Sequence, residues 1–183
     1  MSEKNEELKN VLGNLNELLS QTDLKDVTAE SAGFQELPEG YYLSEVESAK
    51  LTVSKTSKQP MVAFQLKVVD DGVNINPDDE SGSLIKIKGS KNRKIFIYYT
   101  LKDDGSVKRF VTDMLKFEGK EPGQPILDKE YFTNAEVLED ALDILVGLRI
   151  YVQVTVSEKD DGSTSTWQNL ISWKRAEKLE LPL

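Results

Sequence analysis

The segment from Glu36 to Val69 constrains the fold most, because it contains two strand-like stretches joined by a short polar loop. The turn sequence Leu37-Pro38-Glu39-Gly40 leads into an apolar stretch, and residues 61–69 follow a period of two. The loop between the stretches reads Ser-Lys-Thr-Ser-Lys-Gln-Pro, which is cationic and rich in hydroxyl groups. Two strands joined by such a loop are typical of a β-sheet surface that binds the backbone of a polymeric ligand. They favour binding over catalysis.

Side-chain periodicity assigns faces to these two strands. In residues 41–54 the apolar positions change parity between Val46 and Ala49, which predicts a β-bulge near Glu47 or Ser48 that bends the strand. In residues 61–69 alternate side chains are expected to face the core, namely Val62, Phe64, Leu66 and Val68. The outward positions are then Met61, Ala63, Gln65 and Lys67.

The rest of the chain predicts three more strands and two helices. Period-two patterns indicate strands over residues 94–101, 148–156 and 164–173, and helical spacing indicates helices over 107–115 and 137–145. Asp160-Asp161-Gly162-Ser163 reads as a hairpin turn between the last two strands. Residues 70–82 and 116–134 read as loops.

The N-terminal region predicts an amphipathic helix that precedes a linker. Helical spacing places six apolar residues on one face of the segment 1–20, and they are Leu8, Val11, Leu12, Leu15, Leu18 and Leu19. Residues 21–34 are polar and aperiodic, which predicts a linker ahead of a domain over 35–183. A helix set apart by a linker favours self-association into a homo-oligomer, and packing of the helix on its own domain is the alternative.

Composition excludes most catalytic and metal chemistry. The chain has no histidine and no cysteine, so thiol nucleophiles, imidazole bases, ordinary zinc sites and disulfides are impossible. No glycine spacing matches a phosphate-binding loop. The acidic residues of loop 70–82 could hold a hard cation, but the loop lacks the glycine that a calcium loop needs at its sixth position. We expect no enzyme, no cofactor and no metal.

No membrane-spanning or targeting segment is expected. The chain has no run of 18 apolar residues, and its N-terminus is acidic and polar. The absence of cysteine fits a reducing compartment, so a cytoplasmic location is predicted.

Charge is unevenly distributed along the chain. The net charge is −9, but residues 86–109 contain eight cations and two anions, a net charge of +6. The remainder therefore carries −15. This polarisation is compatible with a cationic groove on an acidic body. A lysine-rich, solvated edge strand is the alternative interpretation.

The strand over 94–101 combines charge with aromatic side chains. Alternation places Ile95, Ile97, Tyr99 and Leu101 on one face, and Lys94, Phe96 and Tyr98 on the other. A basic residue followed by two outward aromatic rings suits phosphate contact and base stacking. Burial of both faces, one of them under a helix, is the alternative.

Five strands with a helical element between the third and fourth form the order of an OB-fold barrel. Several short motifs resemble a family of small bacteriophage proteins with an OB-like fold, taken to be single-stranded DNA-binding proteins of phage replication and recombination. The resemblance spans about residues 34–173, and its motifs are mostly structural: Leu37-Pro38-Glu39-Gly40 with Tyr42, Ala49 with Ser54-Lys55, Pro60-Met61, Lys94-Ile95-Phe96, Leu145-Val146-Gly147-Leu148-Arg149-Ile150, and the valine strand with its Asp-Gly hairpin.

The chain departs from the family at both ends. The leucine-striped N-terminal helix is not part of the family's core pattern. The chain also lacks the long acidic tail with which many single-strand binders recruit replication partners. Its last residues, 177–183, are expected to form a frayed end, or else a remnant of such a tail.

The predicted fold is therefore mainly β, a five-stranded OB-fold-like barrel with helices between strands 3 and 4, plus an N-terminal amphipathic helix. The predicted function is non-enzymatic binding of single-stranded DNA with little sequence preference. Expected partners are single-stranded DNA, further copies of the chain, and phage replication or recombination proteins in the bacterial host cytoplasm.

The predicted DNA-binding residues fall into two groups by chemistry. The cations that would contact phosphates are Lys55, Lys58, Lys86, Lys88, Lys91, Arg93 and Lys94. The aromatic residues that would stack on bases are Phe96 and Tyr98, with Tyr151 and Trp167 as further candidates. For Trp167 and Trp173 a place in the core, or as a lid on the core, is favoured over stacking because large aromatic side chains bury so much area. The competing functional class is a structural or interaction protein, such as a virion component or an inhibitor that mimics the charge of DNA.

Overall fold

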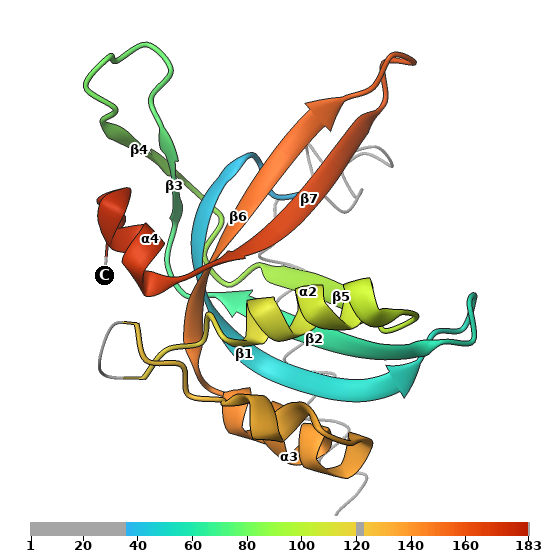
Figure 1. The fold of residues 1–183 in the computed structure, drawn as a ribbon. Helices are drawn as coiled ribbons and strands as arrows, with labels where there is room; N and C mark the ends of the chain where they lie inside the picture. The colour runs from blue at the N-terminus through green and yellow to red at the C-terminus, as the bar shows by residue number, and fades with distance from the viewer. Residues whose placement is uncertain (1–35, 120–122, 183) are drawn as a thin grey trace, which may run out of the picture. The chain divides into compact units, whose positions relative to one another are not determined.

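The computed structural model describes residues 36–119 and 123–182, and they form a mainly β fold with a seven-stranded antiparallel sheet (Figure 1). The strands are β1 (Gly40–Val53), β2 (Pro60–Val68), β3 (Gly72–Ile75), β4 (Leu84–Ile87), β5 (Lys94–Thr100), β6 (Arg149–Glu158) and β7 (Thr164–Ile171). The helices are α2 (Asp104–Met114), the 3-10 helix η1 (Lys129–Phe132), α3 (Ala135–Leu145) and α4 (Trp173–Lys178). Among these described helices, none has the length and apolar character needed to cross a bilayer. The predicted N-terminal helix, its leucine stripe and the linker lie outside the described residues.

Strand β1 organises the sheet because it pairs with three other strands. Its first part, Gly40–Glu45, pairs with β6, and its later part, Ser44–Val53, pairs with β2. The register shifts between Val46 and Ser48, which confirms the predicted bulge. A bulge increases local twist and bends a strand, so one strand can take part in two differently oriented parts of a sheet. Figure 1 shows β1 curving through the centre of the fold.

The sheet is open, so the predicted barrel is not confirmed. Hydrogen-bonded neighbours follow the order β4-β3-β1-β2-β5, with β6 on β1 and β7 on β6. Within the part of the chain that the structure describes, β5 and β7 do not pair with each other.

Two short strands, β3 and β4, were missing from the sequence interpretation. Strand β3 lies inside the segment expected to be an acidic loop, and it pairs with β4 from Gly72 to Ile75. At Gly72 the backbone approaches Tyr42 so closely that an added Cβ would lie 2.3 Å from the ring. The amide of Gly72 also donates to the hydroxyl of Ser90 at 2.7 Å. These contacts hold the hairpin against β1.

The main core confirms the predicted inward faces of β2 and β5. Val62, Phe64, Leu66 and Val68 are buried, as are Ile95, Ile97 and Tyr99. Helices α2 and α3 begin three and two residues before the predicted segments, because Asp103 and Asn134 cap them by accepting backbone hydrogen bonds. Their apolar faces complete this core with Phe110, Met114, Leu138, Ala141, Leu142 and Leu145.

A second, smaller core lies under α4. Sequence periodicity extended the last strand to Trp173, but β7 ends at Ile171 and Ser172 caps α4. The helix and the residues after it cover a cluster made of Tyr41, Val73, Tyr151, Ile171, Ala176 and Leu181. Leu181 is buried and its amide donates to the carbonyl of Ala176 at 3.0 Å. The expectation of a frayed end is therefore wrong for the residues up to Pro182.

Candidate nucleic-acid interface

The outer face of β1, β2 and β5 brings aromatic and basic side chains into rows. Strand register places Gln65 of β2 opposite Phe96 of β5, and Ala63 opposite Tyr98. On the other side of β2, Ala63 lies opposite Lys50 of β1. Residues directly opposite each other in an antiparallel pair share a face. Lys50, Ala63 and Tyr98 therefore form one row across this surface.

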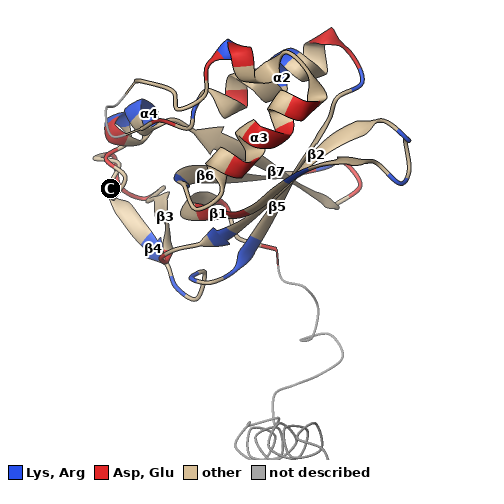
Figure 2. Cartoon of the chain, turned by 90° about the horizontal axis from the view of Figure 1, so that it is seen from below, with Lys and Arg blue, Asp and Glu red and all other residues tan. Residues whose placement is uncertain are grey.

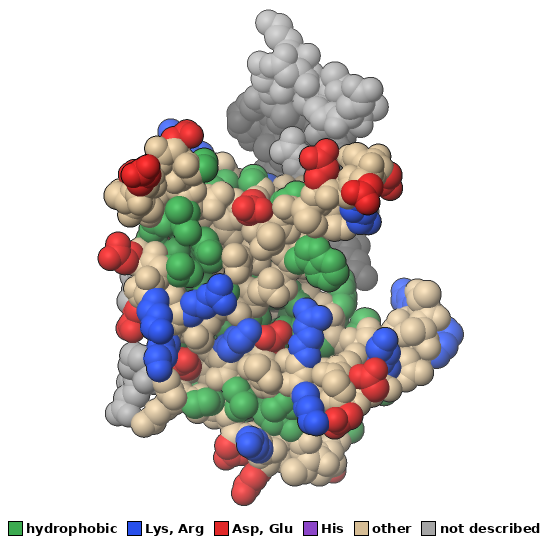
Figure 3. Space-filling model, turned by 45° about the horizontal axis from the view of Figure 1, so that its top comes forward, with side chains coloured by type: hydrophobic (Ala, Val, Ile, Leu, Met, Phe, Trp, Pro, Cys, Tyr) green, Lys and Arg blue, Asp and Glu red, His purple; other side chains and the backbone are tan. Residues whose placement is uncertain are grey.

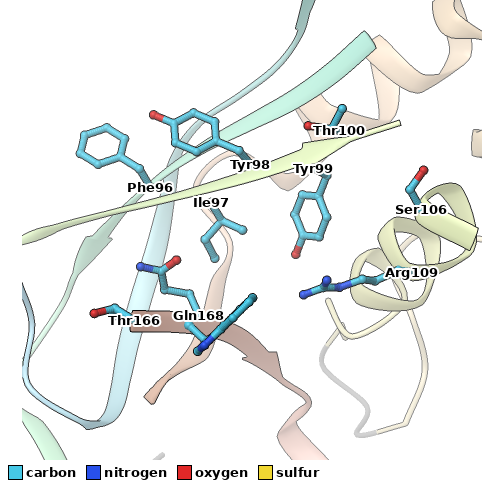
Figure 4. A pocket seen from close by; sticks show the side chains of 10 residues that line it. Phe96, Ile97, Tyr98, Tyr99, Thr100, Ser106, Arg109, Thr166 and Gln168 are labelled. Atoms are coloured by element: carbon cyan, nitrogen blue, oxygen red, sulfur yellow. The ribbon is translucent and has the colours of Figure 1, made fainter. Parts of the chain in front are cut away.

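The two predicted stacking residues are exposed on this face. Phe96 is 39% exposed and Tyr98 is 59% exposed, while their neighbours Ile97 and Tyr99 are buried. Figure 4 shows Phe96 and Tyr98 on one side of β5, and Ile97 and Tyr99 on the other. The alternative in which both faces of β5 are buried is therefore wrong.

Lysines flank the two aromatic rings along the β2–β5 pair. Beyond Tyr98 the pair reaches the β1–β2 loop, where Lys55 and Lys58 are exposed. The loop is held by the amide of Lys58 donating to the carbonyl of Ser54 at 2.9 Å, and Lys58 has a positive φ of 56°. At the other end Lys67 lies opposite Lys94. Figure 2 shows Lys and Arg at the β1–β2 loop and near the start of β5.

Lys94 is already engaged on this face. Its ammonium group forms an ion pair with Glu47, a residue of the bulge, and the Gln65 amide donates to the same carboxylate at 2.8 Å. The hydrogen bonds from Lys94 and Gln65 lower the pKa of Glu47 below its ordinary value, so the carboxylate is charged at neutral pH. A phosphate that contacts Lys94 must therefore compete with Glu47.

The remaining predicted cations lie on β4 and in the connection between β4 and β5. Lys86 lies on β4, at the opposite end of the path β4-β3-β1-β2-β5 from the aromatic strand. Lys88, Lys91 and Arg93 lie in the β4–β5 connection, and Lys88 and Lys91 are exposed. This connection meets the end of β2, because the amide of Val68 donates to the carbonyl of Arg93 at 2.9 Å. The basic stretch therefore spans β4, the β4–β5 connection and the start of β5.

Tyr151 cannot serve as a stacking residue in this conformation. It is only 3% exposed, its ring packs edge-on against Trp173 with centroids 5.9 Å apart, and its hydroxyl donates to the carbonyl of Pro182. Burial raises its pKa to about 12. The prediction fails because α4 covers this face of β6. Trp173 is half-buried beside that cluster, in line with the favoured place in the core or as a lid on it.

Trp167 is instead 58% exposed, so a core position is wrong for this residue.

Three basic residues near the aromatic rings were not among the predicted site residues: Lys50, Lys67 and Arg109. The outward parity of Lys67 was visible in the alternation of β2. Lys50 could be placed only from the register after the bulge, and Arg109 only from the position of α2.

Acidic residues concentrate on helix α3, where Glu139 and Asp143 line a hollow together with Lys50 of β1. Helix α3 carries four exposed acids and no cation, namely Glu136, Glu139, Asp140 and Asp143, as Figure 2 shows. In the space-filling view, Lys and Arg side chains gather in a band across the middle of one face, with hydrophobic side chains beside it (Figure 3). The acidic net charge therefore does not prevent locally positive surface.

The acidic loop after β2 is organised by its own hydrogen bonds. Asp71 accepts from the amides of Ser90 and Lys91, each at 3.1 Å, and Asp79 accepts from the amide of Ser81 at 2.9 Å. Across residues 36–119 and 123–182, no group of three or more acidic side chains is arranged to hold a metal ion.

Comparison of the chain with models of known protein families and with curated proteins gave no match.

Proposed function

We propose that this protein binds single-stranded DNA, without catalysis, through the outer face of β1, β2 and β5. One observation carries the proposal: two aromatic rings, Phe96 and Tyr98, are exposed at alternate positions of one strand. Lysines lie at both ends of the β2–β5 pair that contains this strand. Exposed aromatic rings in a basic groove are the combination that single-strand binders use, since every base presents a π face. The chemistry predicts weak sequence preference.

An OB-like interpretation of the fold supports this proposal. If β1, β2, β5, β6 and β7 are taken as the five OB strands, the helices α2 and α3 fall between the third and fourth strands. OB folds are partly open barrels that bind oligonucleotides on the face of strands 2 and 3 and with the loop between strands 1 and 2. Those elements correspond to β2, β5 and the loop with Lys55 and Lys58. The resemblance to phage replication and recombination proteins points to the same surface.

The spacing of the rings favours a single strand over a duplex. Residues two apart in a strand are separated by about 7 Å. Stacked bases of duplex DNA follow one another at about 3.4 Å. Adjacent bases that stack on Phe96 and Tyr98 must therefore separate from each other, which a single strand allows at lower cost than a duplex.

Titration of a fluorescently labelled single-stranded oligonucleotide tests the proposal. Four lysines near the rings form no ion pair within the described residues: Lys50, Lys55, Lys58 and Lys67. Each phosphate neutralised on a single strand contributes about −0.7 to the slope of log affinity against log salt, so we expect a slope of about −3. The same oligonucleotide as a duplex should bind more weakly. No binding at about 50 mM salt, or binding indifferent to salt, would contradict the proposal.

The acidic surface of α3 favours one second candidate. An exposed helix face with four acids and no cation is suited to contact a basic partner, as a structural protein or a DNA-mimic inhibitor would do. Under that function the protein should compete with DNA for a DNA-binding protein and should not bind DNA itself. The titration above therefore separates the two candidates.

A further inference from the structure

The open side of the sheet is bridged by α2 and the residues that follow it. The hydroxyl of Tyr99 on β5 donates to Asp113 at 2.9 Å. Lys116, just after the helix, pairs with Asp113 at 2.5 Å and donates to the carbonyl of Leu170 on β7 at 2.9 Å. Burial and the nearby charge of Asp113 raise the pKa of Tyr99, which keeps its hydroxyl protonated as a donor. Side-chain hydrogen bonds and one ion pair therefore link β5 to β7, in place of direct pairing between the two strands.

A pocket of about 300 Å³ occupies the open space between β5 and β7. Its lining includes Phe96 and Tyr98, so it borders the proposed DNA-binding face, and it includes Gln168 and Trp167 from β7 and Arg109 from α2. Ligand pockets run from about 300 to 1,000 Å³, which places this one at the size of a small ligand. In Figure 4, Tyr99, Gln168 and Arg109 extend from three different elements toward the same space.

Three lining residues supply the kinds of contact that a nucleotide needs. Trp167 is 58% exposed and offers a large ring for stacking. Gln168 carries an amide with both donors and an acceptor, which suits the edge of a base. Arg109 is exposed and takes part in none of the ion pairs among the described residues. Its guanidinium matches the geometry of a phosphate.

We propose that the pocket between β5 and β7 binds one nucleotide of the DNA strand, with Trp167 against the base, Gln168 at its edge and Arg109 at its phosphate. This inference rests on the proposed function for the class of ligand. It adds a site distinct from the open stacking face, because a concave site with an amide discriminates among bases while exposed rings do not. A strand that passes Tyr98 reaches the pocket by crossing the edge of β5.

Trp167 itself reports on the pocket. The chain has two tryptophans, so Trp173→Phe leaves Trp167 as the single tryptophan and keeps a ring beside Tyr151. We expect deoxynucleoside 5′-monophosphates to quench this fluorescence saturably, with different affinities for the four bases. The reverse variant, Trp167→Phe, should lose the response. It provides the same information if Trp173→Phe does not fold.

Variants then assign the contacts. Arg109→Ala should bring the affinity for a nucleotide down to that for the corresponding nucleoside, and Gln168→Ala should remove the differences among bases. Lys108→Ala is the matched control, because Lys108 is the adjacent cation on α2, pairs with Asp104 and does not line the pocket. Trp167→Ala, which removes the ring, should weaken oligonucleotide binding by about 5- to 150-fold.

The outcomes separate this inference from the proposed function. An oligonucleotide that binds without quenching Trp167, with affinity unchanged by Arg109→Ala and Gln168→Ala, overturns the pocket and leaves DNA binding intact. Saturable quenching by mononucleotides, weakened by Arg109→Ala to the level of the nucleoside, supports the pocket even if oligonucleotides do not bind. In that case it is the proposed function that fails.

Discussion

Removal of the aromatic rings of Phe96 and Tyr98 tests the interface most directly. Base–aromatic stacking contributes about 1–3 kcal/mol per base, so each alanine variant should lose about 5- to 150-fold in affinity for single-stranded DNA. The structural cost should be smaller than for a core aromatic. Tyr98 is 59% exposed, so about two fifths of its side chain, on the order of 80 Å², is in contact with the protein. At about 25 cal/mol per Å² this is at most about 2 kcal/mol of stability.

The assay combines two measurements on the same protein preparations. Fluorescence anisotropy with a labelled oligonucleotide gives the affinity, and thermal unfolding gives the stability. Tyr98→Phe is the matched control for stacking, since it keeps the ring, and its affinity should stay near that of the wild type. Leu66→Ala is the control for core damage. That side chain of β2 is buried and does not line the pocket, so its truncation should cost about 2–5 kcal/mol of stability and leave the affinity per folded molecule unchanged.

The reasoning fails if the alanine variants behave like the core control. A large drop in melting temperature for Tyr98→Ala, with unchanged affinity per folded molecule, would show that the ring supports the sheet and does not contact DNA. Equal affinity losses for Tyr98→Ala and Tyr98→Phe would also contradict stacking, because the phenylalanine ring retains its π face.

Three further changes have defined outcomes. Glu47→Gln removes the carboxylate that holds a lysine of the interface, so affinity should rise and the salt slope should steepen by about 0.7 in the titration. Lys55→Ala with Lys58→Ala should make that slope shallower by about 1.4, without a change in melting temperature, because both side chains are exposed loop positions. Leu12→Glu with Leu15→Glu should reduce the oligomeric state measured by sedimentation while the sheet still unfolds at the same temperature. A monomeric wild type would contradict the predicted self-association.

Period-two patterns predicted the faces of β2 and β5 because each strand has one face in the core. The same parity rule that buried Phe64 and Ile97 turned Phe96 and Tyr98 outward. The bulge near Glu47 was predicted for the same reason, since a parity change within one strand requires an extra residue if both halves are to face the core. The central part of the candidate interface could therefore be predicted from the sequence.

Features that depend on residues far apart in the chain could not be predicted from the sequence. Strands β3 and β4 have four residues each and α4 has six, which is too short for a periodic pattern to stand out. Because α4 was missed, its cover over Tyr151 was missed as well. The ion pair of Lys94 joins it to a residue 47 positions earlier, through the register of three strands. No local pattern contains that information.

The charges of the interface also limit how the protein can bind a polyanion. Four lysines without ion pairs and a slope of about −3 imply that a fourfold rise in salt, from about 50 to 200 mM, reduces affinity by about 60-fold. Stacking on uncharged rings does not depend on counterion release, so a share of the affinity should survive at higher salt. The acids of α3 and the Glu47 carboxylate oppose non-specific attraction to DNA phosphates. A candidate surface that combines exposed rings with nearby acids should therefore discriminate against duplex DNA, because a duplex offers phosphates but no unstacked bases.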